Sequence, residues 1–75
     1  MISKEFFKNR LRELRKEKGQ TQAQVGIAMG LSERHYQKFE AGENFPSVEN
    51  LCRLADYFEV SLDYLMGRSD VRERQ

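Results

Sequence analysis

The chain has very little of the chemistry that enzymes and metalloproteins use. Its 75 residues include one cysteine and one histidine, and the lone Cys52 excludes an internal disulfide framework and cannot build a metal site. The sequence contains no glycine-rich phosphate loop and no cluster with metal-ligand spacing, and its carboxylates are scattered over polar positions. We therefore expect no enzyme activity, no cofactor, no metal and no small-molecule ligand.

Long apolar runs are missing as well. No segment approaches the roughly 20 apolar residues of a helix that spans a bilayer. Residues 1–19 contain nothing that resembles the apolar core of a signal peptide. Together with the lone cysteine, this pattern predicts a cytoplasmic protein that does not enter a membrane. A chain of this length is one domain, and burying only about 60% of its unfolded surface leaves it with a marginal core.

Charge is nearly balanced, with 13 basic and 12 acidic residues. Taken alone, this balance is mild evidence against nucleic-acid binding, which usually leaves a basic footprint. The distribution is uneven, however: basic residues outnumber acidic ones in residues 1–20, whereas acidic residues outnumber basic ones from Gly42 onward. One end of the molecule is therefore predicted to be positive, although a solvated helix face is the commoner explanation of such a run.

Apolar residues recur at helical spacing in five segments, each with a hydroxyl residue before it. The predicted helices are about 4–18, a short one after Thr21, about 33–41, one after Ser47, and 62–66. The remaining predicted N-caps are Ser3, Ser32 and Ser61. No alternation predicts a strand, so the fold class is all-α. We expect residues 1–67 to form the domain and 68–75 to be a short, charged, flexible tail.

The predicted helix at 33–41 has two unlike faces. At about 100° per residue, Tyr36, Phe39 and Glu40 share one side. Two large aromatic rings require burial, so the opposite side, with Arg34, Gln37, Lys38 and Ala41, is expected to face outward. Arginine, glutamine and lysine are side chains that read base edges in the major groove of DNA. An ordinary amphipathic helix with a solvated face explains the same pattern, and this segment alone does not decide between them.

The preceding residues give this helix a context. The spacing Gln22-x-x-Val25-Gly26-x-x-Met29-Gly30-Leu31-Ser32-x-x-x-Tyr36-x-x-Phe39 is that of a helix-turn-helix motif. Gly26 is small where the two helices are expected to cross, and Gly30 allows the positive φ of the turn. Such a unit holds its second helix at the surface, as entry into a groove about 12 Å wide requires.

From about Arg10 to Asp70 the sequence resembles the phage-repressor and Cro-like helix-turn-helix regulators, also called the xenobiotic-response-element family. Four segments carry the resemblance: RLRELRKEKGQTQ, the motif above, PSVENLCRLADYF and VSLDYLMGRSD. The resemblance implies a compact repressor-like domain of five helices that binds double-stranded DNA sequence-specifically. It also implies a homodimer on a palindromic operator, and we expect a repressor of transcription.

The resemblance assigns roles to individual residues as well. Base contacts fall to Ser32, Glu33, Arg34 and Lys38, joined by Gln37 from the outward face, where backbone contacts are also common. The expected DNA-backbone contacts are Thr21, Gln22 and Asn44. Arg15 and Glu40 match positions that often form an ion pair, and the other structural positions of the motif are Gly26, Gly30, Tyr36 and Phe39.

Two acidic residues depart from the family pattern and keep other functions open. Glu43 stands where the loop of many relatives is basic and would repel a phosphate, which leaves Asn44 and the backbone as donors. Glu33 either accepts from cytosine N4 or complements the positive end of its helix. The alternatives are an antitoxin of a toxin–antitoxin pair and a protein-interaction module on the same fold. The short tail argues against the first; Arg34, Gln37 and Lys38 argue against the second.

Overall fold

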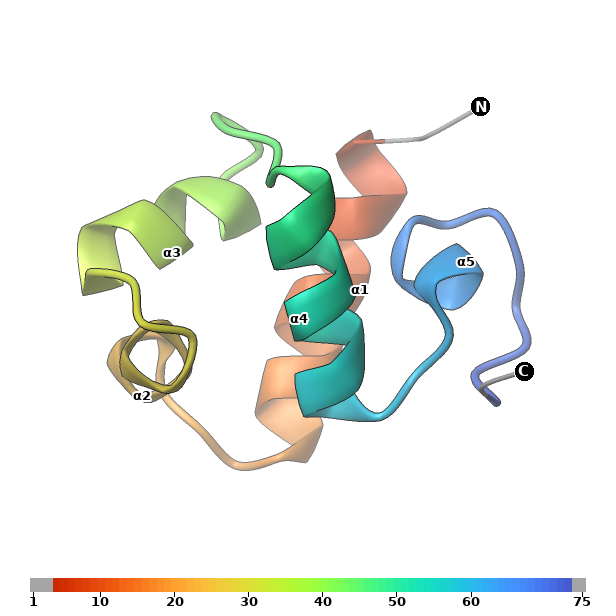
Figure 1. The fold of residues 1–75 in the computed structure, drawn as a ribbon, viewed down its shortest axis with the longest axis horizontal. Helices are drawn as coiled ribbons and strands as arrows, with labels where there is room; N and C mark the ends of the chain where they lie inside the picture. Colours follow the sequence, from red (N-terminus) through yellow and green to blue (C-terminus); the bar gives the residue numbers. More distant parts are fainter. Residues whose placement is uncertain (1–3, 74–75) are drawn as a thin grey trace.

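Five α-helices follow one another with short connections in the computed structural model, which describes residues 4–73 (Figure 1). Among these residues there is no strand, so the all-α prediction is confirmed. In Figure 1, α2 and α3 lie on one side of α1 and α4, and α5 lies on the other side. The bounds are α1 (Lys4–Glu17), α2 (Gln22–Ala28), α3 (Glu33–Glu40), α4 (Val48–Phe58) and α5 (Leu62–Leu65).

Four helices begin at the predicted caps. The hydroxyls of Thr21, Ser32, Ser47 and Ser61 each accept a hydrogen bond from the backbone N–H three residues later, which satisfies a donor of the first turn. The predicted cap at Ser3 lies outside the described residues. Helices α1, α3 and α5 end one residue earlier than predicted, because the chain already turns there toward a glycine in the left-handed conformation.

Every helix contributes a side chain with no exposed surface to one core. These residues are Leu11, Val25, Tyr36, Leu54 and Leu65, one from each of α1 to α5 in order. The core therefore depends on all five helices at once, as expected for a domain this small.

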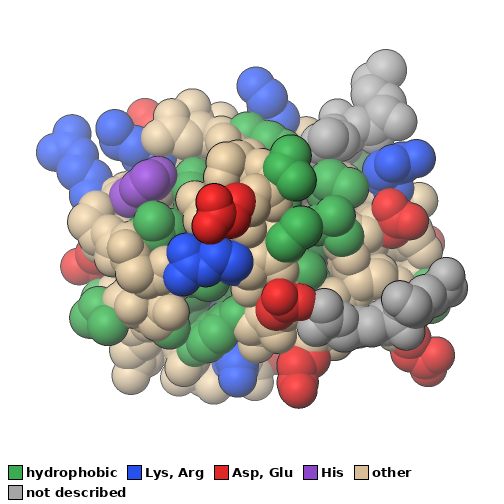
Figure 2. Space-filling view, viewed as in Figure 1, with side chains coloured by type: hydrophobic (Ala, Val, Ile, Leu, Met, Phe, Trp, Pro, Cys, Tyr) green, Lys and Arg blue, Asp and Glu red, His purple; other side chains and the backbone are tan. Residues whose placement is uncertain are grey.

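Charged side chains are spread over the face that Figure 2 shows, and some lie among the hydrophobic ones near its centre. Figure 2 shows Lys, Arg and His side chains projecting from the end of the molecule that holds α3. Hydrophobic side chains lie nearer the centre of the same view, over α4 and toward α5, where Val48 and Cys52 are exposed. Within residues 4–73, no helix has the length and apolar character needed to cross a membrane.

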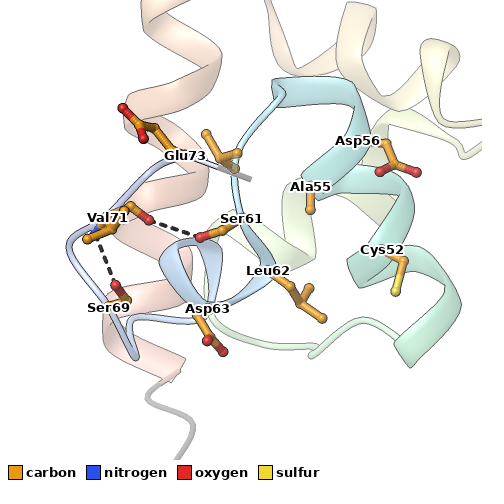
Figure 3. A pocket seen from close by; sticks show the side chains of 10 residues that line it. Cys52, Ala55, Asp56, Ser61, Leu62, Asp63, Ser69, Val71 and Glu73 are labelled. Atoms are coloured by element: carbon orange, nitrogen blue, oxygen red, sulfur yellow. Dashed lines mark hydrogen bonds between the residues drawn. The ribbon is translucent and has the colours of Figure 1, made fainter. Parts of the chain in front are cut away.

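The segment after α5 folds back on the domain (Figure 3). Ser61 fixes it twice: its backbone N–H donates to the Arg72 carbonyl (2.7 Å), and its hydroxyl donates to the Val71 carbonyl (2.9 Å). Arg72 also forms an ion pair with Glu17 at 2.7 Å. The segment borders a shallow pocket that Cys52 and Leu62 line from α4 and α5. No sequence pattern predicts these contacts, and flexibility of this tail stays a prediction.

Arg10 of α1 joins this segment to the rest of the domain. Its guanidinium lies over the Tyr64 ring, 4.1 Å from the centroid, and donates hydrogen bonds to the carbonyls of Tyr64 and Ser69. It also pairs with the exposed Asp70 carboxylate. One side chain thus satisfies two backbone acceptors and stacks on an aromatic ring, an arrangement for which the planar guanidinium is well suited.

The change Arg10→Met should lower the free energy of unfolding by about 1–3 kcal/mol, since charge-assisted hydrogen bonds to the two carbonyls are lost. Urea denaturation followed by circular dichroism measures this difference. Arg12→Met is the matched control, because Arg12 is exposed on the same helix and, among residues 4–73, its side chain bonds only to Asn9. Equal stabilities of the two variants would show that Arg10 does not anchor the segment.

Candidate nucleic-acid interface

Helices α2 and α3 approach each other closely at Gly26. A Cβ at this position would lie 3.1 Å from the Ser32 carbonyl oxygen and 3.4 Å from the Glu33 Cα, both backbone atoms that cannot move aside easily. The turn between the helices places Gly30 at a φ of 73°, where glycine pays no steric cost. The Leu31 N–H then donates to the Gly26 carbonyl at 2.8 Å. These two glycines fix how α3 starts relative to α2.

The two faces of α3 are separated as the sequence predicted. Tyr36 is 0% exposed and Phe39 is 1% exposed, so the aromatic face lies in the core. Arg34 and Gln37 are exposed on the opposite face, and Lys38 is half-buried beside them. The helix therefore presents an arginine, an amide and an ammonium group outward while its other face is anchored.

A buried ion pair joins α1 to α3. The Arg15 Nε and Nη2 atoms donate to the two carboxylate oxygens of Glu40, at 2.7 and 3.0 Å. Gln22 of α2 adds a third hydrogen bond to this carboxylate, at 3.2 Å. The Glu40 side chain is only 4% exposed, so these donors replace the water that the carboxylate has lost.

The surroundings of Glu40 keep it ionised. Burial opposes its charge, but hydrogen bonds from Arg15 and Gln22 outweigh that effect and lower the pKa of Glu40 below its ordinary value of 4.5. Burial and the neighbouring Glu40 carboxylate raise the pKa of Tyr36, so its hydroxyl stays protonated. That hydroxyl is fully buried and makes no hydrogen bond of good geometry with any described residue.

The residues assigned to base contact differ in how far they are engaged within the protein. Ser32 caps α3 through its hydroxyl, and Arg34 makes no hydrogen bond or ion pair with any other described residue. The Gln37 Nε2 atom donates to the Glu33 carboxylate at 3.2 Å, so these two side chains are linked along one face. The Lys38 side chain likewise has no hydrogen bond or ion pair with another described residue, but it is half-buried, so Arg34 is the more exposed of these two cations.

The residues assigned to the DNA backbone lie at the two ends of the motif. Thr21 is exposed at the start of α2, where it forms a capping box with Gln24. Gln22 lies beside Glu40 and still has a second amide hydrogen, since an amide nitrogen carries two. Asn44 is exposed, but its backbone N–H and that of Glu43 both donate to the Lys38 carbonyl, at 3.3 and 3.0 Å. These amides close α3, so a DNA contact by Asn44 would come from its side chain.

The turn between α1 and α2 has a support that sequence reasoning missed. The Tyr57 hydroxyl of α4 donates to the Gln20 side-chain oxygen, and the Arg15 Nη1 atom donates to the Gln20 carbonyl at 3.0 Å. Nothing in the sequence pairs Tyr57 with Gln20, which lie in distant segments. The effect is to hold the start of α2 at a fixed place relative to the ion pair.

The lowered pKa of Glu40 makes the stability of the domain depend on pH. Because this pKa is lowered on folding, the unfolded chain binds more protons than the folded protein below about pH 4.5. The Glu40 carboxylate should therefore contribute its full stabilisation above pH 4.5. This stabilisation should disappear as the pH falls through the pKa of Glu40 in the folded protein. Glu40→Gln should be less stable than the wild type at pH 7, and the difference should shrink under acid, as measured by urea denaturation at each pH.

Glu17→Gln provides the control for this measurement. A hydrogen bond from Arg72 lowers the pKa of Glu17 too, but this pair lies on the surface, so the variant should differ little from the wild type at pH 7. A stability difference for Glu40→Gln that stays constant from pH 7 to pH 3 would contradict the role given to the Glu40 charge.

Comparison with known proteins agrees with this geometry. A family model described as helix-turn-helix matches residues 11–65. The cryptic phage CTXphi transcriptional repressor RstR of Vibrio cholerae is 44% identical over 68 residues, which are 91% of this chain and 61% of the relative. The transcriptional regulator AnsR of Bacillus subtilis is 35% identical over 65 residues, 87% of this chain and 56% of AnsR.

A more distant relative is the transcriptional activator BcrR of Enterococcus faecalis, 29% identical over 87% of this chain and 32% of BcrR. The chain thus spans less than two thirds of the length of each of these relatives. No solved structure is significantly similar to it. The family model covers most of the sequence, including α2, α3 and the turn between them, and the chain belongs to the helix-turn-helix family.

Proposed function

We propose that this protein binds double-stranded DNA sequence-specifically through α3 and acts as a transcriptional repressor. The observation that carries the proposal is the division of α3 into an anchored aromatic face and an outward face with Arg34, Gln37 and Lys38. Burial of Tyr36 and Phe39 supports it, since the outward side chains are thereby held on a rigid helix. The major groove accepts an α-helix presented in this way.

Each outward residue suits a different part of the DNA. Arg34 reads guanine through O6 and N7 in bidentate fashion, which its unengaged guanidinium favours. Ser32, Gln37 and Lys38 supply further donors toward base edges. Glu33 accepts from cytosine N4 or remains at the positive end of α3, where its bond to Gln37 also holds it.

Phosphate contacts would fix the position of the motif on the duplex. We assign them to Thr21 and Gln22 at the start of α2 and to the side chain of Asn44 beyond the end of α3. Gln22 has two roles in this assignment, because one amide hydrogen supports Glu40 and the other is left for a phosphate oxygen. Contacts of this kind set register and orientation but carry no sequence information.

We further propose a homodimer on a palindromic operator, with the two copies of α3 about 34–36 Å apart, one turn of DNA. The choice of repressor over activator follows RstR, which is a phage repressor and shares 44% identity. A regulator of this kind acts where bacterial DNA lies, so the proposed location is the cytoplasm.

One observation favours a second candidate, a protein-interaction module without DNA binding. The net charge is only +1, and Glu43 places a negative charge beside the end of α3. This candidate leaves the exposed Arg34 without a role, so we rank it second. An antitoxin is a form of the same DNA-binding proposal with an added protein partner.

Selection of bound sequences from a random DNA pool tests the proposal directly. The expected result is a palindromic consensus, whose half-site spacing reports the dimer. Recovery of no sequence that binds better than random DNA would refute the proposed function and leave the interaction module.

Arg34→Ala should weaken binding to the selected site by about 1–3 kcal/mol and relax the preference at one base pair. Gln22→Ala should instead weaken binding to all DNA sequences by the same factor, because it removes a phosphate contact. Fluorescence anisotropy with the consensus and with single-base variants of it separates the two results. A uniform loss for Arg34→Ala across all sequences would reassign this residue to the DNA backbone.

A further inference from the structure

Lys8 of α1 lies against the end of α3. A Cβ placed on Gly42, the glycine that ends α3, would meet Lys8 Cδ at 3.2 Å and Lys8 Nζ at 4.0 Å. The lysine stem therefore runs across Gly42, and its ammonium group stays beside the loop that leads to α4. This position places a positive charge from α1 next to the C-terminal end of α3.

The loop itself offers little to a phosphate at this place. The backbone N–H groups of Glu43 and Asn44 are occupied by the Lys38 carbonyl. Glu43 is exposed and negatively charged. Lys38 is the basic residue in the last turn of α3, but residues 41–47 contain no lysine or arginine, so a further cation beside this loop must come from another element.

The Lys8 stem is packed against the domain, but its ammonium group can still bind an anion from outside. Its side chain is 30% exposed, and its ion pair is with Glu5, one turn earlier, at 3.5 Å, where the Glu5 side chain is 74% exposed. Exposed pairs of this kind contribute little, about 0–1 kcal/mol, so Lys8 can exchange Glu5 for a stronger anion. By contrast, Arg10 and Arg15 on the same helix are bound to buried partners.

We propose that Lys8 contacts a DNA phosphate beside the end of α3 and supplies the cation that the loop lacks. The inference rests on the proposed DNA binding and adds α1 to the interface. Lys4, exposed one turn before Lys8 on the same helix face, extends the positive surface away from α3. Glu5 weakens the contact in this arrangement, because the carboxylate competes with the phosphate for Lys8.

A purely structural role for Lys8 makes different predictions. Its ammonium lies near the negative end of the α3 dipole and would stabilise that end by about 0.3–1 kcal/mol. Such a role lowers the stability of a variant without changing how DNA binding depends on salt. Phosphate contacts do change it, because each one releases condensed counterions when DNA binds.

The test uses Lys8→Met, which keeps the apolar stem over Gly42 and removes the charge. Affinity for the selected DNA is measured by fluorescence anisotropy from 50 to 300 mM KCl, for the wild type and the variant. The slope of log K against log salt should become less steep by about 0.9 in Lys8→Met, corresponding to one phosphate contact. Glu5→Gln should bind more tightly than the wild type at 50 mM KCl.

Arg68→Met is the matched control for lost charge. Arg68 has a side chain that is 54% exposed and follows α5, which lies across α1 and α4 from α3 (Figure 1). The slope of log K against log salt for Arg68→Met should equal that of the wild type. Thermal unfolding of each variant shows whether the fold is kept. An unchanged slope for Lys8→Met, with wild-type binding intact, would overturn this inference alone. If the wild-type protein binds no DNA sequence better than random DNA, both the proposed function and the Lys8 contact are overturned.

Discussion

A carboxylate that is almost wholly buried lies where three helices meet, and the geometry of the motif depends on how it is neutralised. Glu40 of α3 receives both donors of the Arg15 fork from α1 and an amide hydrogen from Gln22 of α2. A buried charge without partners is strongly destabilising, so none of these helices can slide without breaking the arrangement. The pair therefore restricts the angle of α3 more tightly than apolar contact alone, because hydrogen bonds are directional and hydrophobic burial is not.

This constraint matters because α3 has only eight residues. An isolated helix of that length is not stable in water, so its shape and direction come from the parts that hold it. Tyr36 and Phe39 supply the apolar anchor, Gly26 permits the close crossing with α2, and the ion pair sets the rotation. Arg34 and Lys38 on the outward face take no part in these contacts, which leaves them available for recognition.

Much of this arrangement follows from local sequence. Four helix starts were predicted from hydroxyl residues that precede segments with apolar residues at helical spacing. Gly30 has the left-handed conformation that was expected for the turn between α2 and α3. Each of these signals acts within a few residues of the chain, which is why sequence alone reveals it.

Most contacts between distant segments were out of reach, and the Arg15–Glu40 ion pair was expected only through the family resemblance. The position of Arg10 over Tyr64, the bond from Tyr57 to Gln20 and the stem of Lys8 across Gly42 all join residues far apart in the chain. The sequence presents Lys8 and Arg10 as two of several cations on α1, and nothing in their spacing distinguishes one that faces a loop from one that stacks on a ring. Which partner each side chain meets is decided by packing of the whole domain.

The bond between Glu33 and Gln37 has a consequence for how such a protein changes over time. The two side chains orient each other, so an exchange at either position alters what the other presents. Arg34 has no such neighbour and can be replaced alone. Among descendants of this chain, substitutions at positions 33 and 37 should therefore be correlated, whereas substitutions at position 34 should occur independently. New binding preferences would then arise most easily through position 34, by single substitutions that leave the fold untouched.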